Sequence, residues 1–452
     1  MAGPPAPSRS WHPPAATTRR WPARCGSATA GSSPPPGYSG RLLRFASALL
    51  AVLVCCAAGA ACSLPGSGAG TVVIYVNAPF ASSPWVGRIG QQGAQLAADE
   101  INNRTGVTVG GRSYHIKIRT ADHKGSTDQA LANIRRAAAE KAVAVIDDGS
   151  TVMVTAGAAE KAGLPLLVYY DGTTGIVDPA VRPNVFRLAP SNQALAERLG
   201  AYLAGKGLRL ALVRDDSPYG ADGAAQLRQA LAAAGTTPVA DVTVPGGLPD
   251  YRDQVARAVA AQPNAVVIWA LAPVVTGVLQ SLRELGSTLP VYTAPTGEDP
   301  SVRTALASRP DWVQGLTFAS LRITDAAGLA RWVQFRLGYE TRYGEDRLAL
   351  GEAIRRPVVQ PPDWQMLSYD MVYLVKAALE KAGTTDPGRG KLAAALNEVQ
   401  TQGANGIPVG WTASNHEGTP KDQVYFAVIL NLNFRPVQDD PLSKAQPQIE
   451  QD

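Results

Sequence analysis

Residues 142–151 have the sequence AVAVIDDGST, in which five apolar residues run directly into a polar turn. A short, uninterrupted apolar run that ends at Gly and Ser is typical of a strand buried on both faces, as in a parallel sheet. The turn Asp147-Asp148-Gly149-Ser150-Thr151 would then follow the carboxyl end of that strand. In open α/β sheets ligands bind at this edge, because helix N-termini there present free N–H groups.

The same alternation of short apolar runs and amphipathic stretches extends in both directions along the chain. In the first half, strands are predicted at Thr71–Val76, Tyr114–Arg119, Ala142–Ile146 and Leu164–Tyr169, with a helix over Gly87–Asn103. A second series has strands at Arg209–Val213, Pro238–Val242, Ala265–Trp269 and Pro290–Thr293, and helices at Tyr219–Ala234, Tyr251–Ala261 and Val274–Leu285. Alternating strands and helices indicate a parallel sheet covered on both faces. The chain is therefore predicted to form two doubly wound α/β lobes.

The boundary between the lobes is expected near Ala189-Pro190, with about three hinge crossovers in all. We expect the first lobe to comprise residues 71–190 and 318–405, and the second lobe residues 191–317 and 406–435. Thr324–Tyr343 and Asp363–Ala382 have helical spacing, and the tail segments Ile407–Trp411 and Gln423–Asn431 are expected to form a final antiparallel pair. Residues 436–452 are predicted to be disordered.

The N-terminal segment has the organisation of an export signal. Residues 1–40 are rich in Pro, Ser, Ala and Gly, which predicts a disordered leader or an over-extended gene start. Residues 41–61 begin with arginine and continue into an apolar run that ends in Gly59-Ala60-Ala61-Cys62. This ending resembles a bacterial lipobox, so we expect lipidation at Cys62 and a flexible tether over residues 62–70. An uncleaved anchor and a plainly secreted protein are the alternatives, and all three place the body outside the cytoplasm.

Composition excludes several classes of function for the folded body. The formal charge of +5 arises from six arginines in residues 1–61, and without them 36 basic side chains stand against 37 acidic ones. This balance gives no electrostatic case for nucleic acid binding. All four cysteines lie at or before Cys62 and the chain has four histidines, which argues against disulfides, a metal site and a histidine-dependent hydrolase. We expect no cofactor and no enzymatic activity.

Polar turns follow the predicted strands at the expected ligand-binding edge. They are the turn at 147–151, Tyr169-Tyr170-Asp171-Gly172-Thr173-Thr174, Asp215-Asp216-Ser217-Pro218-Tyr219-Gly220 and Ala294-Pro295-Thr296-Gly297-Glu298-Asp299. These turns carry hydroxyls, carboxylates and aromatic rings, with almost no histidine or lysine. Such side chains suit the binding of a polar solute by hydrogen bonds and not its chemical conversion.

Three segments resemble the type I periplasmic binding proteins, specifically the branched-chain amino acid receptors of ABC importers. They are Gly93-Ala94-Gln95-Leu96-Ala97-Ala98-Asp99-Glu100-Ile101-Asn102, Asn184-Val185-Phe186-Arg187-Leu188-Ala189-Pro190-Ser191, and the turn that begins at Asp215. The resemblance runs from about Val73 to Asn431. It implies two lobes that close around a small polar solute, such as an amino acid or a related amide or amine, and deliver it to the permease subunits of an importer.

The resemblance also implies roles for individual residues. Ser150 and Thr151 would hold the ligand's carboxylate. Asp171 together with Gly172 or Thr173, next to Tyr170, would bind the ligand from the following loop. Tyr219 would contact the ligand from the second lobe, and Trp85 would line the cleft. The family often has a Pro-Glu-Gly turn whose acid binds the ammonium, but here Thr296 stands at that position, with Glu298 two residues on. We therefore expect Asp171 to accept the ligand's cationic group, with Glu298 in reserve.

Ordinary structural roles are the alternatives for each of these residues. Ser150 and Thr151 are also common helix N-caps, and Asp171 beside Gly172 is also a common turn former. Asp147 and Asp148 are expected at a solvated strand end, and His123 is assigned no role. A sensory module that signals to a membrane partner remains the alternative function. An extracytoplasmic enzyme is less favoured, because the sequence shows no nucleophile–base pair.

Overall fold

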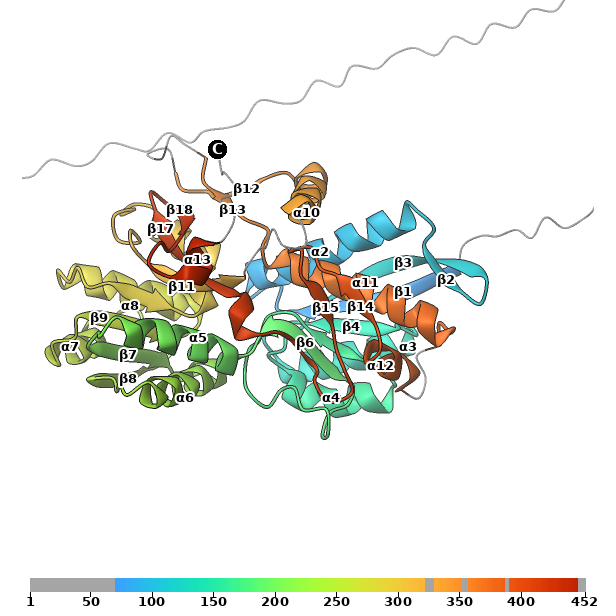
Figure 1. Ribbon diagram of the computed structural model, residues 1–452, viewed down its shortest axis with the longest axis horizontal. Helices are drawn as coiled ribbons and strands as arrows, with labels where there is room; N and C mark the ends of the chain where they lie inside the picture. Colours follow the sequence, from blue (N-terminus) through green and yellow to red (C-terminus); the bar gives the residue numbers. More distant parts are fainter. Residues whose placement is uncertain (1–69, 322–328, 352–353, 355–356, 387–389, 446–452) are drawn as a thin grey trace, which may run out of the picture. The chain divides into compact units, whose positions relative to one another are not determined.

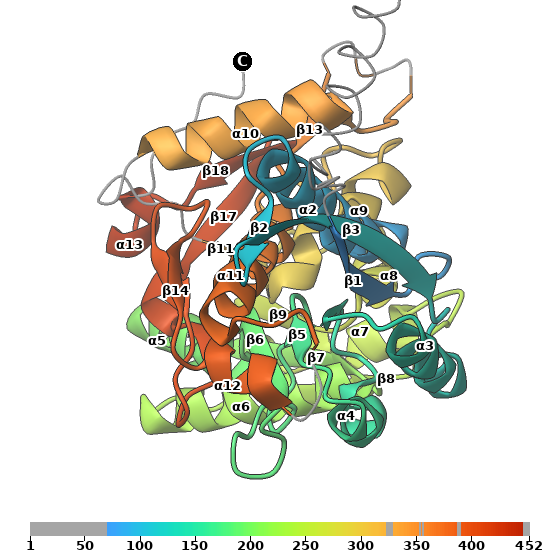
Figure 2. The ribbon, with the colours of Figure 1, turned by 90° about the vertical axis from the view of Figure 1, so that its right-hand side faces the viewer.

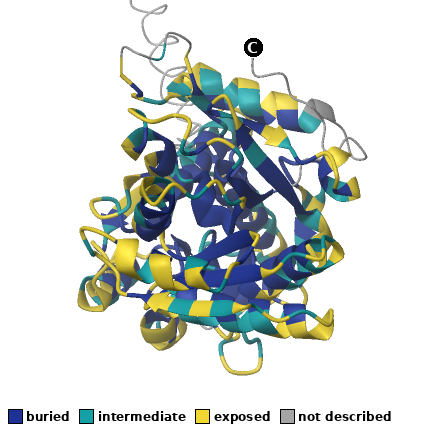
Figure 3. Cartoon of the chain, turned by 90° about the vertical axis from the view of Figure 1, so that its left-hand side faces the viewer, coloured by how far each residue is buried: buried dark blue, intermediate teal, exposed yellow. Residues whose placement is uncertain are grey.

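A computed structural model describes residues 70–321, 329–351, 354, 357–386 and 390–445 of the chain (Figure 1). Two seven-stranded sheets form the body, and two further strand pairs are small and antiparallel. None of the helices within the described ranges is long and apolar enough to cross a membrane. Buried residues lie along the central strands, whereas exposed residues lie on the outward faces of the helices (Figure 3).

The first sheet has the strand order β16-β6-β5-β4-β1-β3-β2. Its neighbours are parallel except for β2 and β3, which pair antiparallel. The strands are β1 (Gly70–Ala78), β2 (Val107–Val109), β3 (Arg112–Asp122), β4 (Ala144–Asp147), β5 (Leu166–Val168), β6 (Val185–Pro190) and β16 (Glu417–Thr419). In register, Ile74 of β1 pairs with Ile118 of β3 on one side and with Ala144 of β4 on the other.

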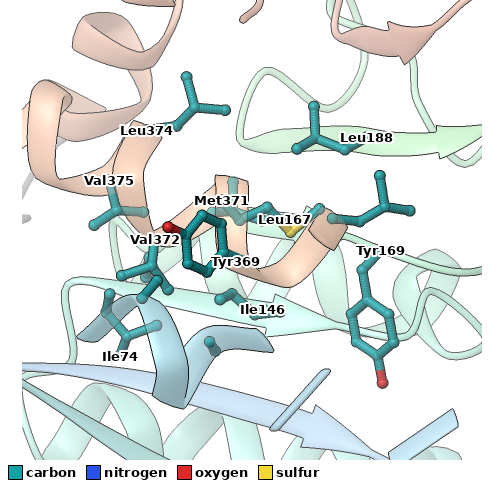
Figure 4. Close-up of a cluster of buried hydrophobic side chains, with 14 of the residues drawn as sticks. Ile74, Ile146, Leu167, Tyr169, Leu188, Tyr369, Met371, Val372, Leu374 and Val375 are labelled. Carbon is teal, nitrogen blue, oxygen red and sulfur yellow. The ribbon is translucent and has the colours of Figure 1, made fainter. Parts of the chain in front are cut away.

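Helices cover both faces of this sheet because apolar residues project from both sides of its strands. They are α2 (Pro84–Asn102), α3 (Thr127–Ala139), α4 (Val152–Lys161), α11 (Gln365–Ala382) and α12 (Lys391–Leu396). Ile74 and Ile146 belong to the cluster with α2 and α11, whereas Tyr75 and Val145 belong to the cluster with α3 and α4. Figure 4 shows Tyr369, Met371, Val372 and other side chains of α11 above the strands. In Figure 2, α2 and α3 lie on opposite sides of β1 and β3.

The second sheet has the strand order β18-β17-β11-β10-β9-β7-β8. Its strands are β7 (Leu210–Asp215), β8 (Ala240–Val244), β9 (Ala265–Trp269), β10 (Val291–Thr293), β11 (Thr317–Leu321), β17 (Val424–Leu430) and β18 (Asn433–Pro436). The five strands β7 to β11 are parallel to one another, whereas β17 and β18 are antiparallel to their neighbours. One face packs on α5 (Asn192–Gly205) and α6 (Pro218–Ala233), and the other on α7 (Arg252–Ala260) and α8 (Ala272–Glu284). Each sheet with its helices forms one lobe, as the sequence predicted. The boundary differs at β11, because residues 318–321 were expected in the first lobe and lie in the second sheet.

The C-terminal segment differs from the expectation in its order and in its strand pairing. Residues 436–445, which were predicted to be disordered, include α13 (Pro441–Lys444), whose Ser443 Oγ accepts from the Phe426 N–H of β17. The segments 407–411 and 423–431 do not pair with each other. Instead β15 (Pro408–Gly410) pairs with β14 (Gln400–Gln402), and β17 pairs with β11 and β18. The sequence of β17, VYFAVIL, is apolar on both faces, so it is buried inside the second sheet. Strand β16 pairs with β6 of the first sheet, so the chain crosses to the second sheet after Thr419 and not near 404–410.

Between β11 of the second sheet and α11 of the first lobe, the chain forms α10 (Leu329–Tyr343) and the short antiparallel pair β12 (Asp346–Arg347) and β13 (Val359–Gln360). Tyr339 of α10 donates its hydroxyl hydrogen to Gln92 Oε1 of α2 over 2.6 Å. Leu350 and Val358, by contrast, join the apolar cluster of the second lobe. The described residues between Leu329 and Gln360 therefore contact both lobes, and α11 begins at Gln365.

Candidate functional site

The turns after β4 and β5 adjoin one another at the carboxyl edge of the first sheet. The Asp171 N–H donates to the carbonyl of Asp148 over 2.8 Å. Gly149 has a φ of +102°, and a Cβ there would come within 2.6 Å of the Asp171 Cβ. A side chain at position 149 would therefore force these two turns apart, which explains the glycine. Two of the turns singled out in the sequence thus form one surface.

Within the first turn, Ser150 and Thr151 have different surroundings. Ser150 is exposed, whereas Thr151 is buried and occupies the N-cap position of α4. The Thr151 side chain makes no capping hydrogen bond, and its buried Oγ1 has no partner among the described residues. The ordinary explanation for this threonine, that its side chain caps the helix, therefore does not apply.

Asp147 and Asp148 are buried, which corrects the expectation of a solvated strand end. Asp147 accepts hydrogen bonds from Asn77 Nδ2 over 2.8 Å and from the Gly149 N–H over 2.9 Å. Asp148 Oδ1 lies 3.0 Å from Nε2 of His123, which is also fully buried. The loop after β3 brings His123 over the strand ends, and this long-range cover had no signal in the local sequence.

Burial determines the proton affinities in this cluster. Burial, reinforced by the charge of Asp148, raises the pKa of Asp147 to about 7. For His123 burial lowers the pKa, but the hydrogen bond and charge of Asp148 more than offset this, so its pKa is raised overall. The cluster therefore holds a partly protonated Asp147 beside the hydrogen-bonded His123 and Asp148, and the bond from the Gly149 N–H to Asp147 fixes the backbone just before Thr151.

The loop after β5 is held by its own side chains and by one arginine. Asp171 Oδ1 accepts from the Thr173 N–H over 2.8 Å and from Thr173 Oγ1 over 2.6 Å. The guanidinium of Arg187 donates to the carbonyls of Asp171 and Thr173. Asp171 Oδ2 accepts no hydrogen bond from the described residues, and burial raises the pKa of this carboxyl group. Asp171 therefore is a turn former that keeps one oxygen for another partner.

Three aromatic rings form a wall beside this loop. Trp85 and Tyr170 meet edge to face with centroids 6.0 Å apart, and Tyr170 meets Trp364 at 5.4 Å. Trp85 comes from the start of α2 and Trp364 from the residue before α11. Trp85 was expected here, but Trp364 was not, because it follows a Pro-rich insertion with no strand to mark the edge of a sheet.

The second lobe contributes Tyr219, Thr296 and Glu298. Tyr219 lies in the first turn of α6, and the other two lie in the 3₁₀ turn Pro295–Glu298 after β10. Burial raises the pKa of Tyr219, and the next largest influence is the negative charge of Asp171 in the first lobe. Burial also raises the pKa of Tyr170. The next largest influences, which raise it further, are electrostatic and come from Asp299, Tyr219, Glu298 and Asp171. The two tyrosines and these carboxyl groups therefore face one region.

Glu298 is fully buried, which no local pattern in the sequence indicates. Its Oε2 accepts from Ser320 Oγ over 2.6 Å and from Trp364 Nε1 over 2.9 Å. Burial raises its pKa to about 7, although both hydrogen bonds favour the charged form. Asp363, also buried, adds a second carboxyl group whose pKa burial and Glu298 raise. At neutral pH the Glu298 side chain is therefore partly protonated and can donate as well as accept.

Four of the site residues end in buried polar atoms that have no hydrogen-bond partner of good geometry in the described part of the chain. These atoms are Trp85 Nε1, Thr151 Oγ1, Thr296 Oγ1 and Glu298 Oε1. Each such atom costs about 1–3 kcal/mol when it stays without a partner, and the described residues hold others outside these four, such as Trp269 Nε1 and Trp332 Nε1. No group of His, Cys, Asp and Glu among the described residues is arranged to hold a metal ion. The site is thus suited to hydrogen-bond a small polar molecule.

The protein has two doubly wound lobes, and each lobe carries polar turns at the carboxyl ends of its strands. This arrangement is that of a type I solute-binding protein. A family model described as periplasmic binding protein matches residues 72–431. The chain therefore belongs to the periplasmic binding protein family, whose members are the extracytoplasmic, non-enzymatic substrate-binding components of ABC transporters.

Individual relatives are distant in sequence. An "amino acid binding protein" of Pseudomonas aeruginosa is 24% identical over 337 residues, which cover 72% of this chain and 80% of that protein. The structure of LivJ, a branched-chain amino acid transporter substrate-binding protein of Streptococcus pneumoniae in complex with isoleucine, has a TM-score of 0.68 and 21% identity and covers 80% of this chain and 97% of LivJ. A solute-binding protein of Rhodopseudomonas palustris in complex with benzoate has a TM-score of 0.66 and 17% identity, covering 81% and 95%. At these identities the two structures show a shared fold.

Proposed function

We propose that this protein captures a small polar solute and delivers it to an ABC importer. The solute is an amino acid or a related amide or amine compound, and the site favours one that carries an amine. The observation that carries the proposal is the set of buried atoms without a hydrogen-bond partner on Trp85, Thr151 and Glu298, together with Thr296, whose side chain lies beside the Tyr219 hydroxyl. They come from both lobes and from separate turns. A ligand that hydrogen-bonds to them would offset the cost of burying them.

The charge of the site favours an amine over a simple carboxylate. Asp171 keeps Oδ2 available, and its charge acts on Tyr219 across the lobes. Arg187, the cation next to this loop, is already paired with Glu417. An ammonium group enclosed beside Asp171 would gain an opposite charge, whereas a bare anion such as benzoate would be repelled. Thr151 at the start of α4 would serve the carboxylate of an amino acid.

Both lobes bind the ligand in this proposal, so ligand would favour the closed arrangement over the open one. A direct bond between the lobes supports the idea. The Thr174 N–H of the first lobe donates to Asp222 Oδ2 of α6 over 2.8 Å, and Asn192 Nδ2 donates to the same oxygen. Closure would thus place the Asp171–Thr174 loop directly against the second lobe.

A matched set of four compounds tests the ligand class. Leucine carries both charges, 3-methylbutylamine lacks the carboxylate, 4-methylpentanoate lacks the amine, and benzoate is an aromatic anion. Thermal shift followed by calorimetry should show binding of one or both amine-bearing compounds and none of the two anions. Small-angle scattering of the complex should give a smaller radius of gyration. Binding of only the anions would reject the proposed class.

Membrane anchoring through Cys62 is also part of the proposal. Cys62 lies outside the described residues. Its lipidation is supported by the surrounding sequence, in which small residues follow an apolar run. A lipidated cysteine would keep the binding protein beside the permease subunits and would raise its local concentration there.

A further inference from the structure

Arg187 has an unusual place for a charged residue. It is the third residue of β6, the strand that lies between β16 and β5 in the first sheet, and its side chain is only 1% exposed. An arginine held this far from water is costly unless all its charge and its N–H groups are matched. Its surroundings therefore show what it is there to hold.

One side of the guanidinium holds the ligand loop. Nη1 donates to the carbonyl of Asp171 over 3.0 Å and to the carbonyl of Thr173 over 2.9 Å. These two carbonyls flank Gly172, and they lie in the same loop as the Asp171 carboxylate. Because the loop has no regular secondary structure, its conformation depends on such contacts.

The other side of the guanidinium holds Glu417. Nε donates to Oε2 over 2.8 Å and Nη2 to Oε1 over 2.5 Å, which makes a two-pronged pair. Glu417 begins β16, the strand that leads through Thr419 to the crossover into the second sheet. Through Arg187, the pair thus ties the ligand loop to Glu417, which lies 230 positions after the arginine in the chain.

We propose that Arg187 and Glu417 are a positioning pair for the ligand loop and that Glu417 also helps to determine which ligand charge the site accepts. Arg187 fixes the two carbonyls, and Glu417 orients the guanidinium and neutralises it. Without Glu417 a buried, unpaired cation would lie directly beneath Asp171 and would weaken its attraction for an ammonium group. The second part rests on the proposed function, whereas the first does not.

Hydrogen exchange of the full-length, ligand-free protein tests the positioning role. In Glu417→Gln and Arg187→Lys, peptides that cover residues 169–177 should exchange roughly tenfold faster than in the wild type, because the loss of a charge-assisted hydrogen bond opens the loop more often. Asp440→Asn is the matched control. It alters another arginine–carboxylate pair, Arg198–Asp440 at 2.5 Å, whose arginine also donates to the Val424 carbonyl in the second sheet. This control should leave the 169–177 peptides unchanged.

The outcome is decisive even if one variant folds poorly, since Glu417→Gln preserves the shape of the side chain. Unchanged exchange in the loop of a folded Glu417→Gln protein, or an equal rise in the Asp440→Asn control, would overturn the positioning role. For the ligand charge, the affinity for the amine-bearing compound that binds the wild type should fall at least about fivefold in Glu417→Gln and stay unchanged in Asp440→Asn, and an unchanged affinity in Glu417→Gln would overturn this part. If no compound binds the wild type, the proposed ligand class fails, but the exchange result still decides the role of Arg187.

Discussion

Trp364 donates its indole N–H to Glu298 Oε2 over 2.9 Å, and so joins the start of α11 to the turn after β10. The same tryptophan contacts Tyr170 of the first-lobe loop. One buried ring therefore connects the aromatic wall of the site to a buried carboxyl group of the second lobe. Because Glu298 is fully enclosed, its protonation state affects both the stability of the protein and the polarity of the site.

Replacement of Glu298 with Gln should change how stability depends on pH. Burial raises the pKa of Glu298 from 4.5 to about 7, so its favourable contribution is complete below about pH 4.5 and is lost as pH rises through 7. The loss amounts to about 3 kcal/mol at most. Glu298→Gln keeps an acceptor for Ser320 and Trp364 and should flatten this part of the profile. Urea unfolding at pH 5 and pH 8 measures it, with exposed Glu160→Gln as the control. If the free energy of unfolding falls equally between pH 5 and pH 8 in the wild type and in Glu298→Gln, the prediction is wrong.

Replacement of Asp171 with Asn should weaken an amine-bearing ligand by about 30-fold or more, since breaking one half of an enclosed charge pair costs about 2–5 kcal/mol. Asn retains the oxygen that accepts from Thr173, so the turn should survive. Calorimetric titration of both proteins with the best compound measures the effect. The exposed Asp216→Asn, which lies after β7, should bind like the wild type. A loss below about threefold would return Asp171 to the role of a turn former.

Replacement of Gly172 with Ala should disturb the loop and the first crossover together. A Cβ at position 172 would lie 2.8 Å from both Asn192 Oδ1 and the Pro190 carbonyl, where the Asn192 N–H already donates to the Gly172 carbonyl over 2.6 Å. Such overpacking typically costs about 1–3 kcal/mol. Gly157→Ala in α4 is the matched control, because nothing lies within 4 Å of its Cβ position, and it should be neutral or stabilising. Thermal unfolding compares the two; equal melting temperatures would refute this explanation for Gly172.

Replacement of Cys62 with Ala should release the protein from the membrane fraction or leave its signal segment uncleaved, because the residue that carries the lipid is lost. Fractionation of cells that express each form, with mass spectrometry of the N-terminal peptide, measures this. Cys25→Ala, before the apolar run, is the control and should stay in the membrane fraction. A wild-type protein that is already soluble and carries no lipid mass would end the lipobox interpretation.

The local sequence was a good guide to strands and to turns. All eight strands singled out in the two α/β series are present, because short runs rich in β-branched residues favour strands. Parallel pairing then brings the turns after β4 and β5 to one edge, which is why Thr151, Tyr170 and Asp171 lie close together. Ser150 differs, since it is exposed beside them. The position of a residue after a strand predicts its edge of the sheet, but not the direction of its side chain.

The sequence by itself determined the two-lobed α/β architecture and the turns at its ligand edge, since these depend on periodicity and on neighbouring residues. Only the tertiary structure decided which polar groups are buried and with whom. Arg187 meets Glu417 across 230 positions and Trp364 meets Glu298 across 66, and no local pattern encodes such distances along the chain. The same holds for Asp147, Asp148 and His123, whose burial depends on how separate loops pack. Charge and proton affinity follow from burial, so the chemistry of the site had to await the fold.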